Sequence, residues 1–460
     1  MAAGLPMAAP ALAAESGRLP GDAMALAWGL PFLGLLLSIA FVPLAAPKFW
    51  HTHFGKVSAA WSAALVLPAM ATFGARAMLE ELWHVMVADY VPFVVLLLAL
   101  YTIGGGVRIA GAVGGTPARN AGVLALGAAL AGVIGTTAAA MLLIHTLLRA
   151  NAWRRHRAHI VIFFIFAVGN IGGALSPLGD PPLFIGFLKG VDFFWPMTHL
   201  FWPMLLCLAV VLPAFWAVDV WFLRHDGDRP SAADIRERPR IEGGWNLALL
   251  ALAVGAVLAS GLWPTGRHLA MFGVQLEYED IARTAALLAL AAFSLRITPA
   301  AVREANAFHW FPMIEIAKLF AGIFVTVAPL IAVLKAGSRG AAAPLLALLN
   351  AGGAPDEAMY FWMTGLLSAF LDNAPTYLVF FNLAGGDARA LMGPLAGTLA
   401  AISAGAVFMG ALTYIGNAPN FMIKAIAEDH EVKMPSFFGY MAWSLAVLGP
   451  TFLLVSFAFF

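Results

Sequence analysis

The sequence predicts an all-α polytopic membrane protein with two inverted repeats, each of five transmembrane helices plus a re-entrant hairpin, with broken helices at the midplane. Three observations lead to this prediction. The 460 residues are 62% hydrophobic and 11% charged, with a mean hydropathy of +0.86, whereas soluble domains carry about 25% charged residues. Apolar segments of roughly 20 residues, long enough to cross a bilayer, recur along the chain. Polar residues and prolines interrupt some of them at matching places in the two halves.

The expected elements follow from the apolar windows, in chain order. They are 23–46, 57–75, 90–107, 120–148, 159–188, 199–223, 245–263, 280–295, 310–334, 358–383, 391–427 and 437–460. The one long charged stretch among them is 224–244. We therefore divide the chain into a leader or signal-peptide remnant (1–22), a first repeat (23–223), a cytoplasmic linker (224–244) and a second, inverted repeat (245–460).

The segment 159–188 is long enough to span the membrane, but its centre cannot remain helical. Residues 169–182 contain four glycines and three prolines together with Asn170, Ser176 and Asp180. Backbone without helical hydrogen bonds is tolerated at membrane depth only where protein or a watery cavity satisfies it. The sequence therefore predicts a broken helix that contributes to an ion or substrate site. A surface loop between two short apolar segments is the alternative.

The two halves share the same order of features. Each has a helix that opens at a proline, then a segment with a polar centre, then a broken segment. The polar centres contain Thr136 and Thr137 in the first half and Asp372, Asn373 and Thr376 in the second. The second break contains Asn417 and Asn420. Such paired interruptions are typical of inverted-repeat transporters.

The distribution of charge supports this topology. If 120–148 and 358–383 are re-entrant hairpins, each half crosses the membrane five times, and an odd number forces opposite orientations. With the linker inside, most basic flanks fall inside as well, as the positive-inside rule expects. These flanks are Lys48, Lys56, Arg108, Arg119, Arg149, Arg157, Arg296, Arg303, Lys424 and Lys433. The amino terminus then lies outside.

The candidate chemistry is that of an alkali cation and a proton. Asp180 and Asp372 are acidic residues beside broken backbone, and charged side chains within a membrane are usually functional. Freed carbonyls, a carboxylate and amide oxygens suit a hard cation, and the same carboxylate can bind a proton instead. We expect Asp372, Asn373 and Asn417 to form one half-site and bind the cation. Thr136, Thr137, Asn170 and Asp180 would form the other half-site. Asp180 can alternatively serve as a cap for the helix that resumes at residue 181.

Two further charges lie in the segment 310–334. Glu315 and Lys318 are three positions apart, which is the spacing of a helical ion pair. They are a possible coupling pair or a structural pair. Asp219, near the inner end of its segment, is expected to pair with Arg224.

Several functions are disfavoured. The net charge of +1 argues against a nucleic-acid partner, the single Cys207 has no disulfide partner, and the histidines show no metal-ligand spacing. No phosphate-binding loop occurs near the glycines at 104–106. We expect no enzyme activity and no cofactor, with Na⁺ and H⁺ as transported or coupling ions.

The chain resembles the ion-transporter superfamily, which includes NhaD-type sodium/proton antiporters, arsenite exporters, citrate transporters and dicarboxylate/sodium symporters. The matching residues are 135–137, 170–173 with 176–180, 315–320, 372–376 and 416–420. The resemblance implies a multi-pass protein of a bacterial-type inner membrane. The dicarboxylate symporters are dimers, so it also implies a homodimer in the lipid bilayer.

One departure from the family favours a cation over a carboxylate. The dicarboxylate symporters have a Ser-Asn-Thr triplet at each hairpin tip, whereas this chain has Gly135-Thr136-Thr137 at one tip and the acidic Asp372 at the other. We therefore expect a sodium/proton antiporter. The alternative is a sodium- or proton-coupled transporter of citrate or another carboxylate. A membrane scaffold or sensor is the third class, but it would not need polar broken helices.

Overall fold

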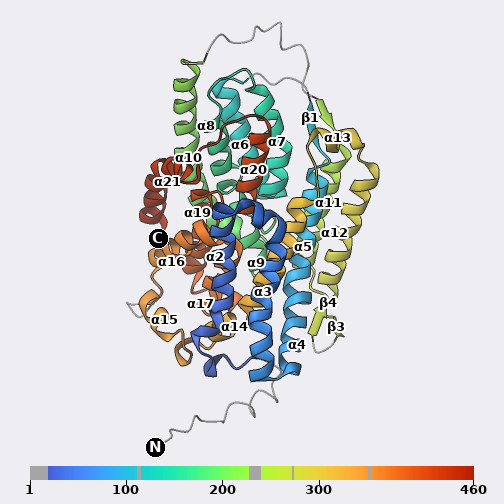
Figure 1. The fold of residues 1–460 in the computed structure, drawn as a ribbon, viewed down its shortest axis with the longest axis vertical. Coiled ribbons are helices and arrows are strands. Elements are labelled where there is room, and N and C mark those ends of the chain that lie inside the picture. The colour runs from blue at the N-terminus through green and yellow to red at the C-terminus, as the bar shows by residue number, and fades with distance from the viewer. Residues whose placement is uncertain (1–18, 111–114, 227–239, 272–273, 351–353) are drawn as a thin grey trace, which may run out of the picture.

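Helices form over most of the chain, because backbone in a bilayer must satisfy its own hydrogen bonds. The computed structural model describes residues 19–110, 115–226, 240–271, 274–350 and 354–460 (Figure 1). Residues 1–18 of the expected leader and 227–239 of the expected linker lie outside the described residues. The all-α polytopic prediction is confirmed.

The first half of the chain begins with two short 3₁₀ turns, η1 (Gly21–Ala23) and η2 (Leu26–Gly29). Its α-helices are α2 (Leu30–Ala45), α3 (Pro47–Phe73), α4 (Ala75–His84), α5 (Val91–Gly104), α6 (Pro117–Ile134), α7 (Thr136–Ala150), α8 (Ala158–Ala167), α9 (Pro181–Leu188) and α10 (Trp195–Leu223). The π-helix η3 (Val85–Tyr90) joins α4 to α5, and the 3₁₀ turn η4 (Ile171–Leu175) lies between α8 and α9.

The second half repeats this organisation with small additions. Its α-helices are α11 (Trp245–Leu262), α12 (Tyr278–Ile297), α13 (Ala300–Ala305), α14 (Phe311–Lys335), α15 (Ala343–Leu349), α16 (Glu357–Leu371), α17 (Asn373–Leu383), α18 (Ala388–Met392), α19 (Ala396–Met409), α20 (Ala418–Asp429) and α21 (Phe437–Phe459). The 3₁₀ turns are η5 (Gly337–Arg339) and η6 (Gly410–Leu412).

The strands of the described chain are short. β3 (His268–Met271) and β4 (Val274–Glu277) form one antiparallel pair. β1 (Arg108–Ala110) pairs with β2 (Arg240–Glu242), and an Arg108–Glu242 ion pair of 3.0 Å reinforces them. This pairing fixes the end of the linker to the first half.

Within the described residues, nine helices are long and apolar enough to cross a membrane. The predicted segments overlap these helices, but two spans begin well before the predicted residue. The span formed by α4, η3 and α5 begins at Ala75 rather than at Tyr90, and α3 also begins early. α3 begins at Pro47 rather than at Val57, so Lys48 and Lys56 of the predicted flank are helical. The ends of α11 carry Trp245 and Trp263, which are 77% and 78% exposed. Tryptophan concentrates at both membrane interfaces, so α11 extends from one interface to the other.

The helices pack in two groups. In one group α3 packs against α2 and α14, and α5 packs against α11 and α12. The other contains the hairpins α6–α7 and α16–α17, the broken helices α8–α9 and α19–α20, and α10 and α21. Contacts of α5 with α7 and of α14 with α17 join the groups.

The two hairpins lie in opposite halves of the molecule along its longest axis. Figure 1 shows α6 and α7 in the upper half and α16 and α17 in the lower half. This placement agrees with hairpins that enter from opposite sides. The inverted orientation of the two repeats in the membrane stays a prediction.

Cysteine labelling tests that orientation. In a Cys207→Ala background, Ala118→Cys and Arg155→Cys, at the ends of the first hairpin, should react with an impermeant maleimide only from the cytoplasmic side. Ala354→Cys and Arg389→Cys, at the ends of the second hairpin, should react only from outside. All four positions are exposed. Labelling of the first pair from opposite sides would make the first hairpin an ordinary crossing and remove the inverted repeat.

Candidate functional site

Four short helices have their amino termini close together in the interior. α7 begins at Thr136 and α17 begins at Asn373. Asp180 and Asn417 are the N-cap residues of α9 and α20. A helix amino terminus has unpaired N–H groups and a partial positive charge. Four of them together favour negative charge at the place where they meet.

The carboxylate of Asp180 is at the centre of this arrangement. Its Oδ1 accepts hydrogen bonds from Thr136 Oγ1 at 3.2 Å and from Asn417 Nδ2 at 2.9 Å. Its Oδ2 accepts one from Asn373 Nδ2. Asp180 is only 1% exposed. The carboxylate therefore joins both hairpin tips to both broken helices.

Two asparagines close the backbone breaks around this centre. Asn170 Nδ2 donates to Asn420 Oδ1 at 2.7 Å, and Asn170 Oδ1 accepts from Asn417 Nδ2 at 3.2 Å. Asn420 Nδ2 donates to the carbonyl oxygens of Gly410 and Thr413. Both side chains thus satisfy groups that the broken helices leave unpaired, which is what buried polar groups require.

The breaks in the two halves have the same local structure. Asp180 and Asn417 are 237 positions apart, and so are Ser176 and Thr413. Ser176 Oγ donates to the carbonyl oxygen of Gly132 at 2.6 Å, and Thr413 Oγ1 donates to that of Ala369. Each of these hydrogen bonds spans 44 positions. Ser176 thus holds the break against α6 in this structure, and its predicted binding role stays a prediction.

The hairpin tips also correspond. Gly135 has φ 93° and ψ 147°, and Asp372 has φ 70° and ψ 144°. Positive φ is costly for residues other than glycine, although aspartate and asparagine tolerate it best. An acidic residue therefore occupies a position that is glycine in the other hairpin.

The structure does not keep the residues of the two predicted half-sites apart, and the roles predicted for them in ion binding stay predictions. Asp372 Oδ1 accepts from the backbone N–H of Ala374 at 3.2 Å, so Asp372 caps its own helix. Thr376 Oγ1 donates to the carbonyl oxygen of Asp372 at 2.7 Å, a back-bond that threonine often makes. Asn373 and Asn417 donate to Asp180 instead, which joins residues of the two predicted half-sites.

Two amide oxygens at the centre have no hydrogen-bond partner among the described residues. Asn373 Oδ1 and Asn417 Oδ1 are buried and accept no hydrogen bond, and their residues are 0% and 1% exposed. Buried polar atoms are rarely left unpaired without a reason such as a missing ion. Oxygen ligands of this kind suit a hard cation. In the described residues no three His, Cys, Asp or Glu side chains gather at one place.

A small cavity lies beside Asp180. Its volume is about 30 Å³, and its walls include Thr136, Thr137, Asp180, Phe184 and Met313. This volume is about that of one water molecule. In this conformation the cavity accommodates a dehydrated cation or a water molecule, and it is too small for a tricarboxylate.

Glu315 and Lys318 do not pair with each other within the described structure. Glu315 Oε1 accepts from Trp50 Nε1 at 3.2 Å. The Lys318 ammonium lies 5.5 Å from the centroid of the Phe54 ring. The ion pair that we predicted from their spacing is therefore wrong, because packing of α14 against α3 offers each side chain an aromatic partner.

The Trp50 contact predicts how Glu315 responds to substitution. Glu315→Gln keeps an oxygen that accepts from Trp50, so the unfolding free energy should change by less than about 1 kcal/mol. Glu315→Leu leaves the indole N–H unpaired and should lower stability by about 1–3 kcal/mol. Thermal unfolding in detergent measures both. A stable Glu315→Gln protein without transport would instead assign the carboxylate to the mechanism.

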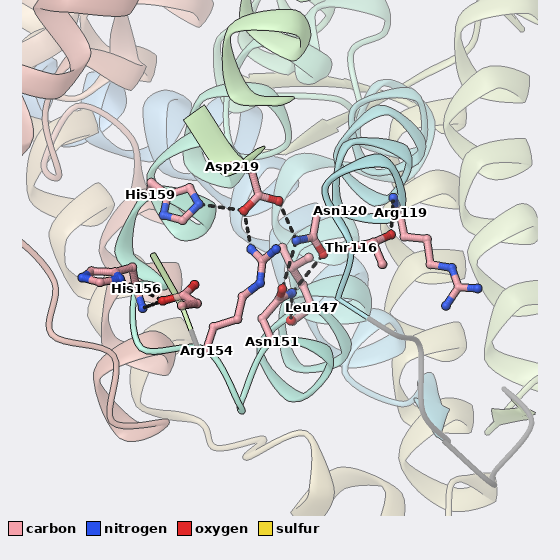
Figure 2. A network of polar contacts seen from close by, with 10 residues as sticks. Thr116, Arg119, Asn120, Leu147, Asn151, Arg154, His156, His159 and Asp219 are labelled. Carbon is pink, nitrogen blue, oxygen red and sulfur yellow. Dashed lines mark hydrogen bonds and ion pairs between the residues drawn. The ribbon is translucent and has the colours of Figure 1, made fainter. Parts of the chain in front are cut away.

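A second buried network, which the sequence did not predict, lies at the other end of the first hairpin (Figure 2). Asp219 forms an ion pair with Arg154 and accepts from His159 Nε2 and Asn120 Nδ2, each at 2.9 Å. Asn120 also exchanges two hydrogen bonds with Asn151. The predicted Asp219–Arg224 pair is wrong. Arg224 is nearer to Asp219 in sequence, but the loop after α7 brings Arg154 to Asp219 instead.

These features define a class of protein. The membrane-spanning helices, two broken helices and a buried polar centre are those of a multi-pass membrane transporter. The chain belongs to the family described as "Putative citrate transport", whose sequence model matches residues 21–460. No curated protein matches the chain.

Proposed function

We propose that the protein is a sodium/proton antiporter of a bacterial-type inner membrane, with Asp180 as the group that binds cation and proton in turn. The observation that carries the proposal is the buried Asp180 carboxylate beside the two unpartnered amide oxygens of Asn373 and Asn417. With Thr136 Oγ1, these atoms supply several oxygen ligands around one negative charge. That is the environment that a hard monovalent cation needs.

Exchange follows from competition at Asp180. A proton on the carboxylate removes the charge that attracts sodium, and bound sodium blocks the proton. The four helix amino termini favour the ionised carboxylate between these two events. One site that accepts either ion, but not both, converts alternating access into antiport. Na⁺ and H⁺ are the only ions that this cycle needs, and no cofactor takes part.

Uptake of citrate or a related carboxylate is the second candidate. The family description favours it, and the four helix amino termini could also attract a carboxylate substrate. Two features of the described site weigh against it. The partners of Asp180 are two amides and a hydroxyl, with no lysine or arginine among them, and the adjoining cavity holds only about 30 Å³.

An assay in proteoliposomes with an internal pH dye separates the candidates. Sodium added outside should alkalinise the lumen, because the entry of sodium drives protons out of the lumen. Potassium should not have this effect. Lithium shows how selective the site is. Citrate without sodium should give no signal. A pH change or uptake that requires citrate, with none from sodium alone, would favour the carboxylate transporter and contradict antiport.

A further inference from the structure

A second, larger cavity lies between the beginning of α6 and the end of α10, and Asp180 is not among its lining residues. Its volume is about 320 Å³. One wall is formed by residues 116–118, and the other by Trp216, Val220 and Leu223, with Arg224 beside them. The cavity thus has an apolar wall and one basic group.

Among the described residues, no acid forms an ion pair with Arg119 or Arg224, the arginines at this end of α6 and α10. Arg224 is exposed, as is Arg119, which follows the α6 wall. Neither forms an ion pair within the described structure. Two described acids near the end of α10 are engaged elsewhere, because Asp219 of α10 pairs with Arg154, and Asp226, just after the helix, pairs with His156. Figure 2 shows the Arg119 guanidinium extending away from the Asp219 network.

The cavity also lies at a membrane interface. Trp216 and Trp221, in the last turns of α10, are 50% and 56% exposed. Tryptophans in such positions mark the headgroup level. α10 leads into the linker, which charge places on the cytoplasmic side. A cavity there adjoins acyl chains on one side and phosphate groups on the other.

We propose that this cavity binds an anionic phospholipid. Arginine binds phosphate through paired N–H donors, and basic pockets between membrane helices on the cytoplasmic side bind acidic headgroups. The phosphate lies at Arg224 and Arg119, and the upper part of an acyl chain packs on Trp216 and Val220. The bound lipid joins α6, and with it the first hairpin, to α10.

Native mass spectrometry of the full-length protein tests the site. The protein is transferred from detergent with either phosphatidylglycerol or phosphatidylcholine, which differ in headgroup charge. The parent should retain one phosphatidylglycerol in preference to phosphatidylcholine. Arg224→Gln and Arg119→Gln should each weaken retention by about fivefold. Val220→Trp fills the cavity and should reduce retention although both arginines remain.

Arg296→Gln is the matched control, since Arg296 is an exposed arginine in the last turn of α12 and forms no ion pair among the described residues. It should retain the lipid as the parent does. Equal retention of the two lipids, or losses in Arg296→Gln as large as in Arg224→Gln, would overturn the proposal. So would a rise in unfolding temperature with inorganic phosphate alone that equals the rise with phosphatidylglycerol, because the cavity would then be a site for a soluble anion.

Discussion

Asp180→Asn should abolish sodium-driven proton movement and leave the protein folded. The new side chain keeps the size of aspartate and one acceptor oxygen, and the unpartnered Asn373 Oδ1 can turn to accept from its amide. The substituted side chain carries no charge and cannot bind or release a proton. Loss of a buried charge partner costs about 3 kcal/mol or more, which corresponds to about a hundredfold weaker sodium binding. Initial rates in the proteoliposome assay, at several sodium concentrations, measure the effect.

Asp372→Asn is the matched control for this experiment. Asparagine can still accept from the Ala374 N–H, and the described side-chain partners of Asp180 are Thr136, Asn373 and Asn417 rather than Asp372. This variant should retain most of the exchange activity. The reverse pattern, with exchange lost in Asp372→Asn and unchanged in Asp180→Asn, would make Asp180 a structural cap and return the cation site to Asp372, as the sequence alone predicts.

The second large effect concerns stability. Asp219→Asn should lower the unfolding free energy by about 3–5 kcal/mol, because it leaves the Arg154 guanidinium buried without its counter-charge. Both side chains of this pair are 0% exposed. The change should appear as a lower midpoint of thermal unfolding and less protein in the membrane.

Glu242→Gln provides a control for the loss of an ion pair as such. The Arg108–Glu242 pair has side chains that are 28% and 24% exposed, and partly solvated pairs contribute about 1 kcal/mol or less. The double variant Arg154→Met, Asp219→Leu should recover much of the stability, since an apolar pair can replace a buried ion pair. An Asp219→Asn protein as stable as Glu242→Gln would show that water already solvates Arg154.

Much of the fold is predictable from the sequence because the bilayer imposes few solutions. Apolar length predicts the membrane helices, and glycine, proline and polar residues locate the breaks at 169–182 and 416–420. The start of α3 is not predictable in this way. Lys48, His51 and Lys56 resemble an interfacial flank, and only packing against α14 shows that the helix continues through them.

The candidate site is predictable in composition and not in connectivity. Asp180, Asn373, Asn417 and Thr136 were all expected at a site, but local sequence favoured Asp372 as its centre. The positive φ of Asp372 directs its carboxylate to the N–H of Ala374 in its own helix. The local sequence does not reveal this backbone conformation. The sequence does contain one signal of this connectivity, a short motif that occurs once in each half. Gly-Ala-Leu-Ser at 173–176 and Gly-Ala-Leu-Thr at 410–413 align the two halves and pair Asp180 with Asn417.

The Asp219 network and the Asp180 centre are completed at different times during synthesis. All partners of Asp219 lie in the first half, between Asn120 and His159, so the first hairpin can be joined to α10 as soon as α10 has entered the membrane. Asp180 obtains only Thr136 from that half, and its two amide donors come from the second half. When synthesis has reached the end of α10, the Asp180 carboxylate therefore lies in the bilayer without its two amide donors. Insertion of the second half removes this unfavourable state, and the first half expressed alone would retain it and be a substrate for membrane proteases.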